Sequence, residues 1–338
     1  MNSFASPADF DVALQSLSVP DAEAAAAARA RQGELTKPPG SLGRLEDIAL
    51  FFAGWQGTER PAIERGRAAI FAGNHGMVVH GVSAFPASVT QAMVANFAAG
   101  GAAINALAGA AGLELKVVPL DLDRPTADFT TAPAMTGDEC LAALSAGAAT
   151  VEPGLQLLVV GEMGIGNTTA AAALCARSFG GAPASWVGPG TGVDAEGVAR
   201  KVAVVERALA CHADAPRTPF ETLRRLGGRE IAAIAGAVLV ARKQRVPVVL
   251  DGFISCAALA PLAAAAPTIT DHCLAGHCSA EPGHLGLLAR LGLEPLLSLG
   301  LRLGEGSGAA LAVSLIRAAL ATHNGMATFA EAGVAGSL

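Results

Sequence analysis

Short apolar runs alternate with longer amphipathic segments from about residue 66 onwards. The apolar runs predict four strands: Ala68–Ala72, Leu115–Leu120, Leu155–Val160 and Val246–Leu250. The segments between them predict four helices: Ser88–Ala108, Thr168–Phe179, Glu196–Cys211 and Arg229–Lys243. Nearly continuous apolar strands are typical of a parallel sheet that is buried on both faces. The alternation of strand and helix therefore predicts a doubly wound α/β fold.

The two ends of the chain have helical patterns instead. The Ala-rich segment 21–35 favours a helix with Asp21 as its N-cap, and a second helix is expected at Leu45–Gln56. The clearest helix near the other end is Gly308–His323. We expect residues 1–60 and 305–338 to form a small helical domain, and residues 61–304 a large α/β domain. No linker marks a sharp boundary between them.

Composition narrows the classes of function. The 338 residues carry a net charge of −6, which disfavours a nucleic-acid partner. The acidic start lacks the pattern of a signal peptide, and the longest apolar stretch, near Ile231–Ala241, is too short to span a bilayer. We therefore expect a cytoplasmic protein without membrane contact. The six cysteines are interpreted as buried small residues rather than disulfide partners.

A glycine-rich loop follows the third predicted strand. Residues 161–168 contain G-x-x-x-x-G-N-T, with Asn167 where a P-loop has its phosphate-binding lysine. A Walker-type NTPase is therefore disfavoured. Glycines and the N–H groups at a helix start still suit a monophosphate, although a plain glycine turn is the alternative. Glu162 beside this loop is unusual for a phosphate site and suggests a sugar hydroxyl or a cation as its partner.

Further polar segments follow other predicted strands or open helices, and each has a structural alternative. His75 lies between glycines after the first strand and either faces a ligand or bonds locally within a turn. The loop 187–194 places Thr191 before Lys201, which suits a phosphate or an ordinary helix face. Asp251 follows the fourth strand and either binds ribose hydroxyls or caps the next helix.

Two segments near the C-terminus complete the candidates. Residues 271–284 contain two cysteines and three histidines, but their spacing fits no tight zinc-ligand pair, so a polar strand and loop is favoured over a metal site. Glu305 lies among glycines at the start of a helix, where a carboxylate has almost no side-chain cover. It is either a surface residue favoured by the helix dipole or a group that meets a substrate closely.

Eight segments in this order resemble the nicotinate-nucleotide–dimethylbenzimidazole phosphoribosyltransferases. They are KPPGSLGRLE (37–46), NHG with GVSAFP (74–86), VTQAMVANFAAGGAAIN (89–105), GEMGIGNTT (161–169), ARKVAVVERAL (199–209), VLDGFISCAALA (249–260), HCSAEPGH (277–284) and RLGEGSGAALA (302–312). Any one segment is weak, but eight in register across nearly the whole chain are highly specific. Two positions depart from many members, which have Asp where Asn74 and Ser298 stand, and this puts a charge role for Asn74 in doubt.

The resemblance implies a Rossmann-like large domain, a homodimer, and catalysis without a metal or organic cofactor. It implies that the substrates are nicotinate mononucleotide and a benzimidazole base, with Glu305 as the general base. The residues expected to bind substrate are Glu162, Gly164, Gly166, Asn167, Thr168, Gly190, Thr191, Lys201, Asp251 and Ser279 around the phosphoribosyl group, and Phe85, Pro86, Met93 and Leu303 around the base. Two rivals remain: a degenerate nucleotide-using enzyme, disfavoured by Asn167, and a non-catalytic nucleotide sensor, disfavoured by Glu305.

Overall fold

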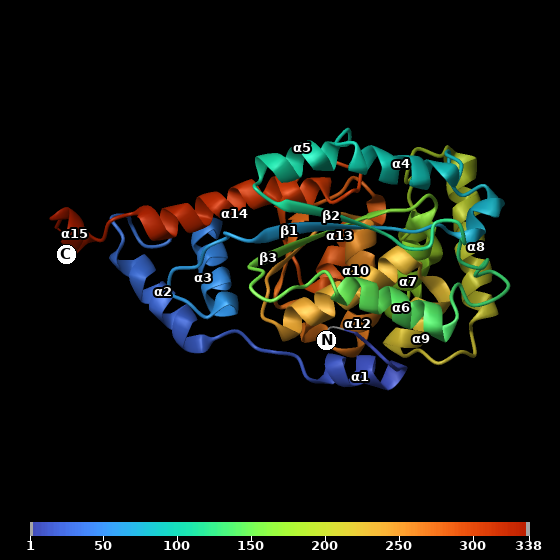
Figure 1. Ribbon diagram of the computed structural model, residues 1–338, viewed down its shortest axis with the longest axis horizontal. Helices are drawn as coiled ribbons and strands as arrows, with labels where there is room; N and C mark the ends of the chain where they lie inside the picture. The colour runs from blue at the N-terminus through green and yellow to red at the C-terminus, as the bar shows by residue number, and fades with distance from the viewer. Residues whose placement is uncertain (1–2, 336–338) are drawn as a thin grey trace.

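A single parallel sheet organises the computed structural model, which describes residues 3–335 (Figure 1). Its strands are β1 Gly66–Ala72, β2 Glu114–Pro119, β3 Leu157–Met163, β4 Val248–Leu250, β5 Cys273–His277 and β6 Pro295–Leu297. They lie in the order β2-β1-β3-β4-β5-β6, and every neighbouring pair is parallel. All seven residues of β1 are buried. The predicted α/β class with a parallel, helix-flanked sheet is confirmed.

Helices cover both faces of this sheet (Figure 1). One face carries α4 (Ser88–Ala98), α5 (Ala103–Ala110) and α14 (Ser307–Gly325), whose apolar residues join those of the strands in one core. The other face carries, among others, α6 (Gly137–Ala148), α7 (Asn167–Phe179), α10 (Arg229–Lys243), α11 (Phe253–Ala257) and α12 (Ala260–Ala265). The remaining helices are α1 (Pro7–Gln15), α2 (Ala22–Glu34), α3 (Arg44–Gln56), α8 (Ala195–Cys211), α9 (Pro219–Leu226), α13 (Pro282–Leu291) and α15 (Phe329–Ala332).

Most predicted elements agree with the structure, and the differences have local causes. The helix expected at Ser88–Ala108 is wrong as one element, because Gly100 has a φ of 79° and ends α4 before α5 begins. Strand β3 continues past the predicted end to Met163, so Glu162 is a strand residue. Strand β6 was not predicted, since three residues that include a proline give no strand pattern.

The interrupted α4–α5 segment is apolar and largely unburied. By length and composition alone, Ser88–Ala110 could cross a membrane, and only 22% of its most apolar window is buried. The break at Gly100 leaves helices of 11 and 8 residues, each shorter than the roughly 20 residues that span a bilayer. The exposed residues of this segment are mostly alanine and glycine.

The helical ends of the chain meet beside the amino ends of the strands. Helices α2 and α3 pack together and against the second half of α14 (Figure 1). Arg31 of α2 donates to the carbonyls of His323 and Met326. Helix α1, by contrast, packs on α9 of the large unit, where Phe10 contacts Phe220. The division at residues 60 and 305 stays a prediction, and its outermost residues 1–2 and 336–338 lie outside the described residues.

The strand order places the site. Strand β1 lies between β2 and β3, so the connections leave in opposite directions on its two sides, and ligands bind at the carboxyl ends next to such a reversal. The register aligns Ala72 of β1 with Met163 of β3. Gly73 continues this alignment by donating its N–H to the Met163 carbonyl at 3.0 Å. The segments after β1 and β3 therefore start side by side.

Candidate active site

A cleft opens at the carboxyl ends of β3, β4 and β5. It encloses about 610 Å³ including its open mouth. Its wall combines eight of the predicted residues with neighbours that were not singled out. The predicted residues are Glu162, Gly164, Asn167, Thr168, Gly190, Thr191, Ser279 and Leu303, and the others are Met163, Ile165, Gly252, Phe253, Ile254, His277, Glu281, Arg302 and Gly304. Segments far apart in sequence are thus brought together at one edge of the sheet.

The turn from β3 into α7 forms one wall of the cleft. Gly166 is the N-cap of α7 with a φ of 91°, and a side chain there would strain the backbone and lie 2.8 Å from Val78. Helix α7 has no side-chain cap, and the N–H groups of Asn167 and Thr169 donate to the carbonyls of Gly164 and Gly166 within the turn. The helix dipole stabilises an anion at such a helix start.

Glu162 lies at the end of β3, with only 6% of its surface exposed. Its Oε2 accepts a 2.5 Å hydrogen bond from Asn167 Nδ2, which explains the amide where a P-loop has lysine. Burial raises the pKa of Glu162 to about 8, although the Asn167 bond opposes this, and the carboxylates of Asp251, Glu230 and Glu305 raise it further. The Glu162 carboxyl is therefore mainly neutral near pH 7.

Glu305 lies in a backbone conformation that side chains rarely adopt. Its φ is 63°, and the glycines on both sides have φ values of 85° and 78°. Its N–H donates to the Glu162 carbonyl at 3.2 Å. The close approach is possible because Gly161 of β3 lacks a side chain: a Cβ there would lie 2.4 Å from Gly306 N. The strained turn is thus pressed against the end of β3.

The Glu305 carboxylate is buried and incompletely paired. The residue is 5% exposed, and its Oε2 has no hydrogen-bond partner among the described residues. Burial raises the pKa of Glu305 and the nearby Asp251 raises it further, while a backbone hydrogen bond from Ile104 lowers it. A carboxylate with a free oxygen and a raised pKa has the properties of a proton acceptor.

Asp251 lies behind this turn instead of on the cleft wall. Its two oxygens accept from Gly306 N at 3.1 Å and Ala309 N at 2.9 Å, and His277 Nε2 lies 3.4 Å from Oδ1. Asp251 therefore caps α14, a helix more than 50 residues further along, and fixes the residue beside Glu305. The cap suggested by the sequence exists, but on α14 instead of the helix that follows Asp251.

Lys201 lies behind the opposite wall and is fully buried. Its Nζ donates to the Gly188 carbonyl at 2.6 Å and to Thr168 Oγ1 at 2.9 Å. Burial lowers the pKa of Lys201 to about 8, while the charge of Glu281 raises it. Glu281, which was not predicted, accepts from Gly190 N at 2.8 Å, and its second oxygen has no hydrogen-bond partner within residues 3–335. Its place after HCS in the 277–284 segment could have identified it.

The residues predicted to contact the base are more dispersed. Leu303 lines the cleft and is 57% exposed. Phe85 and Pro86 are exposed outside the wall, in a segment tied to the rim by Ser83, whose hydroxyl lies 3.3 Å from Thr191 Oγ1. Met93 on α4 is half-buried against the core on that face of the sheet. Phe85, Pro86 and Met93 therefore do not line the cleft of the single chain.

The histidines of the candidate segments differ in their surroundings: His277 lines the cleft beside Asp251, whereas His75 and His284 are engaged inside the protein. His75 is 2% exposed and does not face the cleft or bond within its own turn, since Nε2 lies 2.6 Å from Oε1 of the distant Glu230. His284 Nδ1 accepts from Ser279 N at 2.8 Å. Residues 3–335 contain no group of three or more His, Cys, Asp or Glu side chains arranged to hold a metal ion.

Comparison with known proteins agrees with this geometry. A family model described as a phosphoribosyltransferase (DBI_PRT) matches residues 17–334. A nicotinate-nucleotide–dimethylbenzimidazole phosphoribosyltransferase of Novosphingobium aromaticivorans is 81% identical over the full length of both chains, and one of Ruegeria pomeroyi is 62% identical over 93% of each. The crystal structure of CobT from Thermus thermophilus superposes with a TM-score of 0.87 at 45% identity, over 93% of this chain and all of that one. The chain belongs to the nicotinate-nucleotide–dimethylbenzimidazole phosphoribosyltransferase family.

Proposed function

We propose that this enzyme moves the 5-phosphoribosyl group of nicotinate mononucleotide to 5,6-dimethylbenzimidazole, giving α-ribazole 5′-phosphate and nicotinate. This is the step that prepares the lower ligand of cobalamin. The observation that carries the proposal is the buried Glu305 carboxylate, which has an unpartnered oxygen and a raised pKa beside the cleft. Relatives that carry this activity in their names support the choice of substrates.

The chemistry requires a base more than an acid. The pyridinium of nicotinate mononucleotide is already a good leaving group. When one benzimidazole nitrogen bonds to C1′ of the ribose and the C1′–pyridinium bond breaks, the proton on the other ring nitrogen becomes acidic. Glu305 takes that proton, which prevents positive charge from accumulating on the new product. Attack opposite the leaving group inverts C1′ and gives the α-riboside. Holding both substrates in line lowers the barrier by about 7–11 kcal/mol at best.

The cleft divides into a phosphoribosyl part and a base part. Gly164, Gly166, Asn167 and Thr168 present the N-terminus of α7 to the phosphoribosyl group, and Gly190, Thr191 and Ser279 face it from other loops. Lys201 supports this wall from behind through Thr168. Leu303, with Phe85, Pro86 and Met93 at or beyond the rim, supplies apolar surface for the base.

Two copies of the chain form the working enzyme in this proposal. The exposed apolar surface of α4 and α5 supports a homodimer, because such a surface is stabilised by burial against a second copy. Phe85, Pro86 and Met93 lie on or next to the same segment, so dimer formation would also cover the base side of the cleft. Sedimentation equilibrium should give twice the 33.6 kDa chain mass, and a monomer at micromolar concentration would contradict the homodimer. We assign the enzyme to the cytoplasm.

Product analysis tests the reaction. Purified protein is mixed with nicotinate mononucleotide and dimethylbenzimidazole without added metal, and the products are separated and identified by mass spectrometry. Equal amounts of nicotinate and α-ribazole 5′-phosphate are expected. Folded protein that binds the nucleotide but forms no product with any benzimidazole would overturn the proposal and favour the nucleotide sensor. Adenine and a phenol serve as alternative acceptors.

A further inference from the structure

A buried histidine–glutamate pair lies behind the cleft wall and has no part in the reaction described above. His75 follows β1, and Glu230 is in the first turn of α10. Nε2 of His75 lies 2.6 Å from Oε1 of Glu230, and neither side chain is exposed to any extent. The two residues are 155 positions apart in sequence, so only the folded chain brings them together.

This pair is not explained by stability. Oε2 of Glu230 and Nδ1 of His75 have no hydrogen-bond partner among the described residues. A buried carboxylate with one unpaired oxygen is costly, and apolar residues of similar volume often serve stability as well or better. Buried polar groups that remain incompletely paired are concentrated where they serve function.

Glycines bring the pair to the cleft. A Cβ at Gly73 would lie 2.3 Å from Glu230 Oε2, and one at Gly228 would lie 2.3 Å from Cε1 of His75. A Cβ at Gly164, a residue of the cleft wall, would lie 3.1 Å from Glu230 Oε1 and 2.8 Å from the Gly73 carbonyl. The Glu230 carboxylate therefore lies directly behind Gly164, a residue of the cleft wall.

Glu162, two residues before Gly164, is a cleft carboxyl that the charge of Glu230 affects. The negative charges of Asp251, Glu230 and Glu305 all act on Glu162, in addition to its own burial. Other titratable groups of this region include His75 behind Glu230, the buried Arg229 next to Glu230, which pairs with Glu139, His277 beside Asp251, and Glu281 and Arg302 on the cleft wall. Asp251 and Glu305 are fixed to each other through the start of α14, whereas Glu230 comes from a separate element.

We propose that Glu230, held by His75, is a positioning residue of the transferase site. It fixes the Gly73 and Gly164 backbone behind the cleft and holds a negative charge against Glu162, so that Glu162 meets the substrate in its neutral form. A neutral Glu162 donates a hydrogen bond to the phosphoribosyl group, whereas an ionised one would repel the phosphate. The inference accounts for a glutamate beside a phosphate-binding loop, and it rests on the proposed function.

The test reads the titration of Glu162 directly, without substrates. Full-length protein is prepared with ¹³C at the glutamate carboxyl carbons, and the Glu162 signal is assigned by its loss in Glu162→Gln. In Glu230→Gln, which keeps the shape but removes the charge, the midpoint should fall by about one pH unit from the parent value. Glu230→Asp should restore a midpoint close to that of the parent. Glu221→Gln, which breaks the remote ion pairs with Arg224 and Arg225, should leave it unchanged.

A folded Glu230→Gln variant whose Glu162 signal titrates as in the parent would overturn the inference. If this variant does not fold, the double variant His75→Gln with Glu230→Gln decides by the same criterion, because two amides replace the pair with a neutral one. The alkaline limb of kcat/KM should move to lower pH together with the carboxyl signal. The NMR titration needs no turnover. An unchanged Glu162 titration would therefore overturn this inference alone, whereas a parent enzyme that forms no α-ribazole 5′-phosphate would overturn the proposed function.

Discussion

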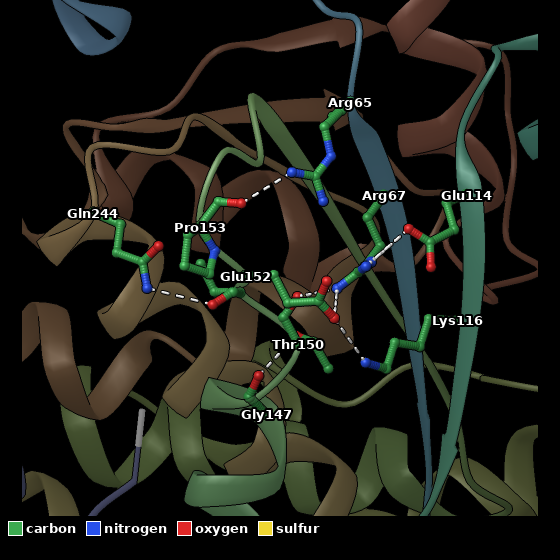
Figure 2. Close-up of polar contacts among 10 residues, drawn as sticks. Arg65, Arg67, Glu114, Lys116, Gly147, Thr150, Glu152, Pro153 and Gln244 are labelled. Carbon is green, nitrogen blue, oxygen red and sulfur yellow. Dashed lines mark hydrogen bonds and ion pairs between the residues drawn. The ribbon is translucent and has the colours of Figure 1, made fainter. Parts of the chain in front are cut away.

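Buried charged side chains lie near both ends of β1 and β3, but they differ in how completely they are hydrogen-bonded. At the amino end, Arg67 is 3% exposed, and each nitrogen of its guanidinium has an acceptor (Figure 2). The acceptors are Glu114, Glu152 and the Thr150 carbonyl, at 2.6–3.1 Å. At the carboxyl end, Glu305 and Glu230 each have one oxygen without a hydrogen-bond partner in the described part of the chain. Complete pairing serves stability, whereas the unpaired acids are available to substrate or act on one another.

The pKa values of Glu152 and Glu162 are shifted in opposite directions, so these two carboxyls have opposite effects on the free energy of unfolding as the pH changes. The Arg67 hydrogen bond lowers the pKa of Glu152 to about 2, so its contribution is present above pH 4.5 and is lost as the pH falls toward 2. Burial raises the pKa of Glu162 to about 8, so the folded state holds a proton that the unfolded state releases above pH 4.5. Glu162 therefore lowers the free energy of unfolding as the pH rises from 4.5 to 8. This decrease in the free energy of unfolding comes from a residue at the carboxyl end of the sheet.

The largest expected effect is that of Glu305→Gln on turnover. The amide keeps the shape but cannot accept the proton, so kcat should fall by about 10²–10⁴-fold. Binding of nicotinate mononucleotide, measured by calorimetry, should remain within a few-fold of the parent. Unchanged kcat in the folded variant would remove Glu305 from the role of base.

Arg67→Met removes the fully paired buried cation at the amino end of β1. It leaves the Thr150 carbonyl and the two carboxylates without the guanidinium, so the free energy of unfolding in urea should fall by about 1–3 kcal/mol. Turnover per folded molecule should stay unchanged, because Arg67 lies at the opposite end of the strand from the cleft. Arg124→Met is the matched control, since the Arg124 side chain is 73% exposed and its pair with Asp121 should contribute little. A loss of turnover without a loss of stability would refute the division between the two ends.

Lys201→Met removes a cation that is buried at the carboxyl end of the sheet and has hydrogen-bond partners there. Its loss removes the donor to Gly188 and Thr168, so the KM for nicotinate mononucleotide should rise by about tenfold, with little change for the base. Arg200→Met, on the exposed side of the same helix, serves as control. Equal increases for both substrates would argue against support of the phosphate side.

The smallest effect is expected for Glu152→Gln, which is seen only in acid. The parent should lose stability between pH 4.5 and 2 as Glu152 becomes protonated and its bond with Arg67 weakens. The variant should show a shallower decline over that range, measured by thermal unfolding at a series of pH values. Parallel curves for the two proteins would mean that the exposed Glu152 carboxylate contributes nothing measurable.

Local patterns predicted the elements better than they predicted the contacts. Helix α10 begins and ends where the amphipathic pattern places it, and Asp21 caps α2 through the Ala24 N–H at 2.9 Å. The pattern failed at Gly100, where two glycines outweigh the apolar spacing, and at β6, which is too short to have a period. His75 illustrates the other limit, because its partner Glu230 has no local signal that connects the two residues.

The sequence by itself determined the parallel α/β class, the glycine loop after β3 and the family. These follow from apolar periodicity and from eight ordered motifs, which are properties of neighbouring residues. Only the tertiary structure decided that Asp251 caps α14, that Lys201 supports the cleft from behind and that Glu230 lies behind Gly164. The physical reason is that burial, charge and hydrogen-bond pairing depend on which distant segments the sheet brings together at its carboxyl edge.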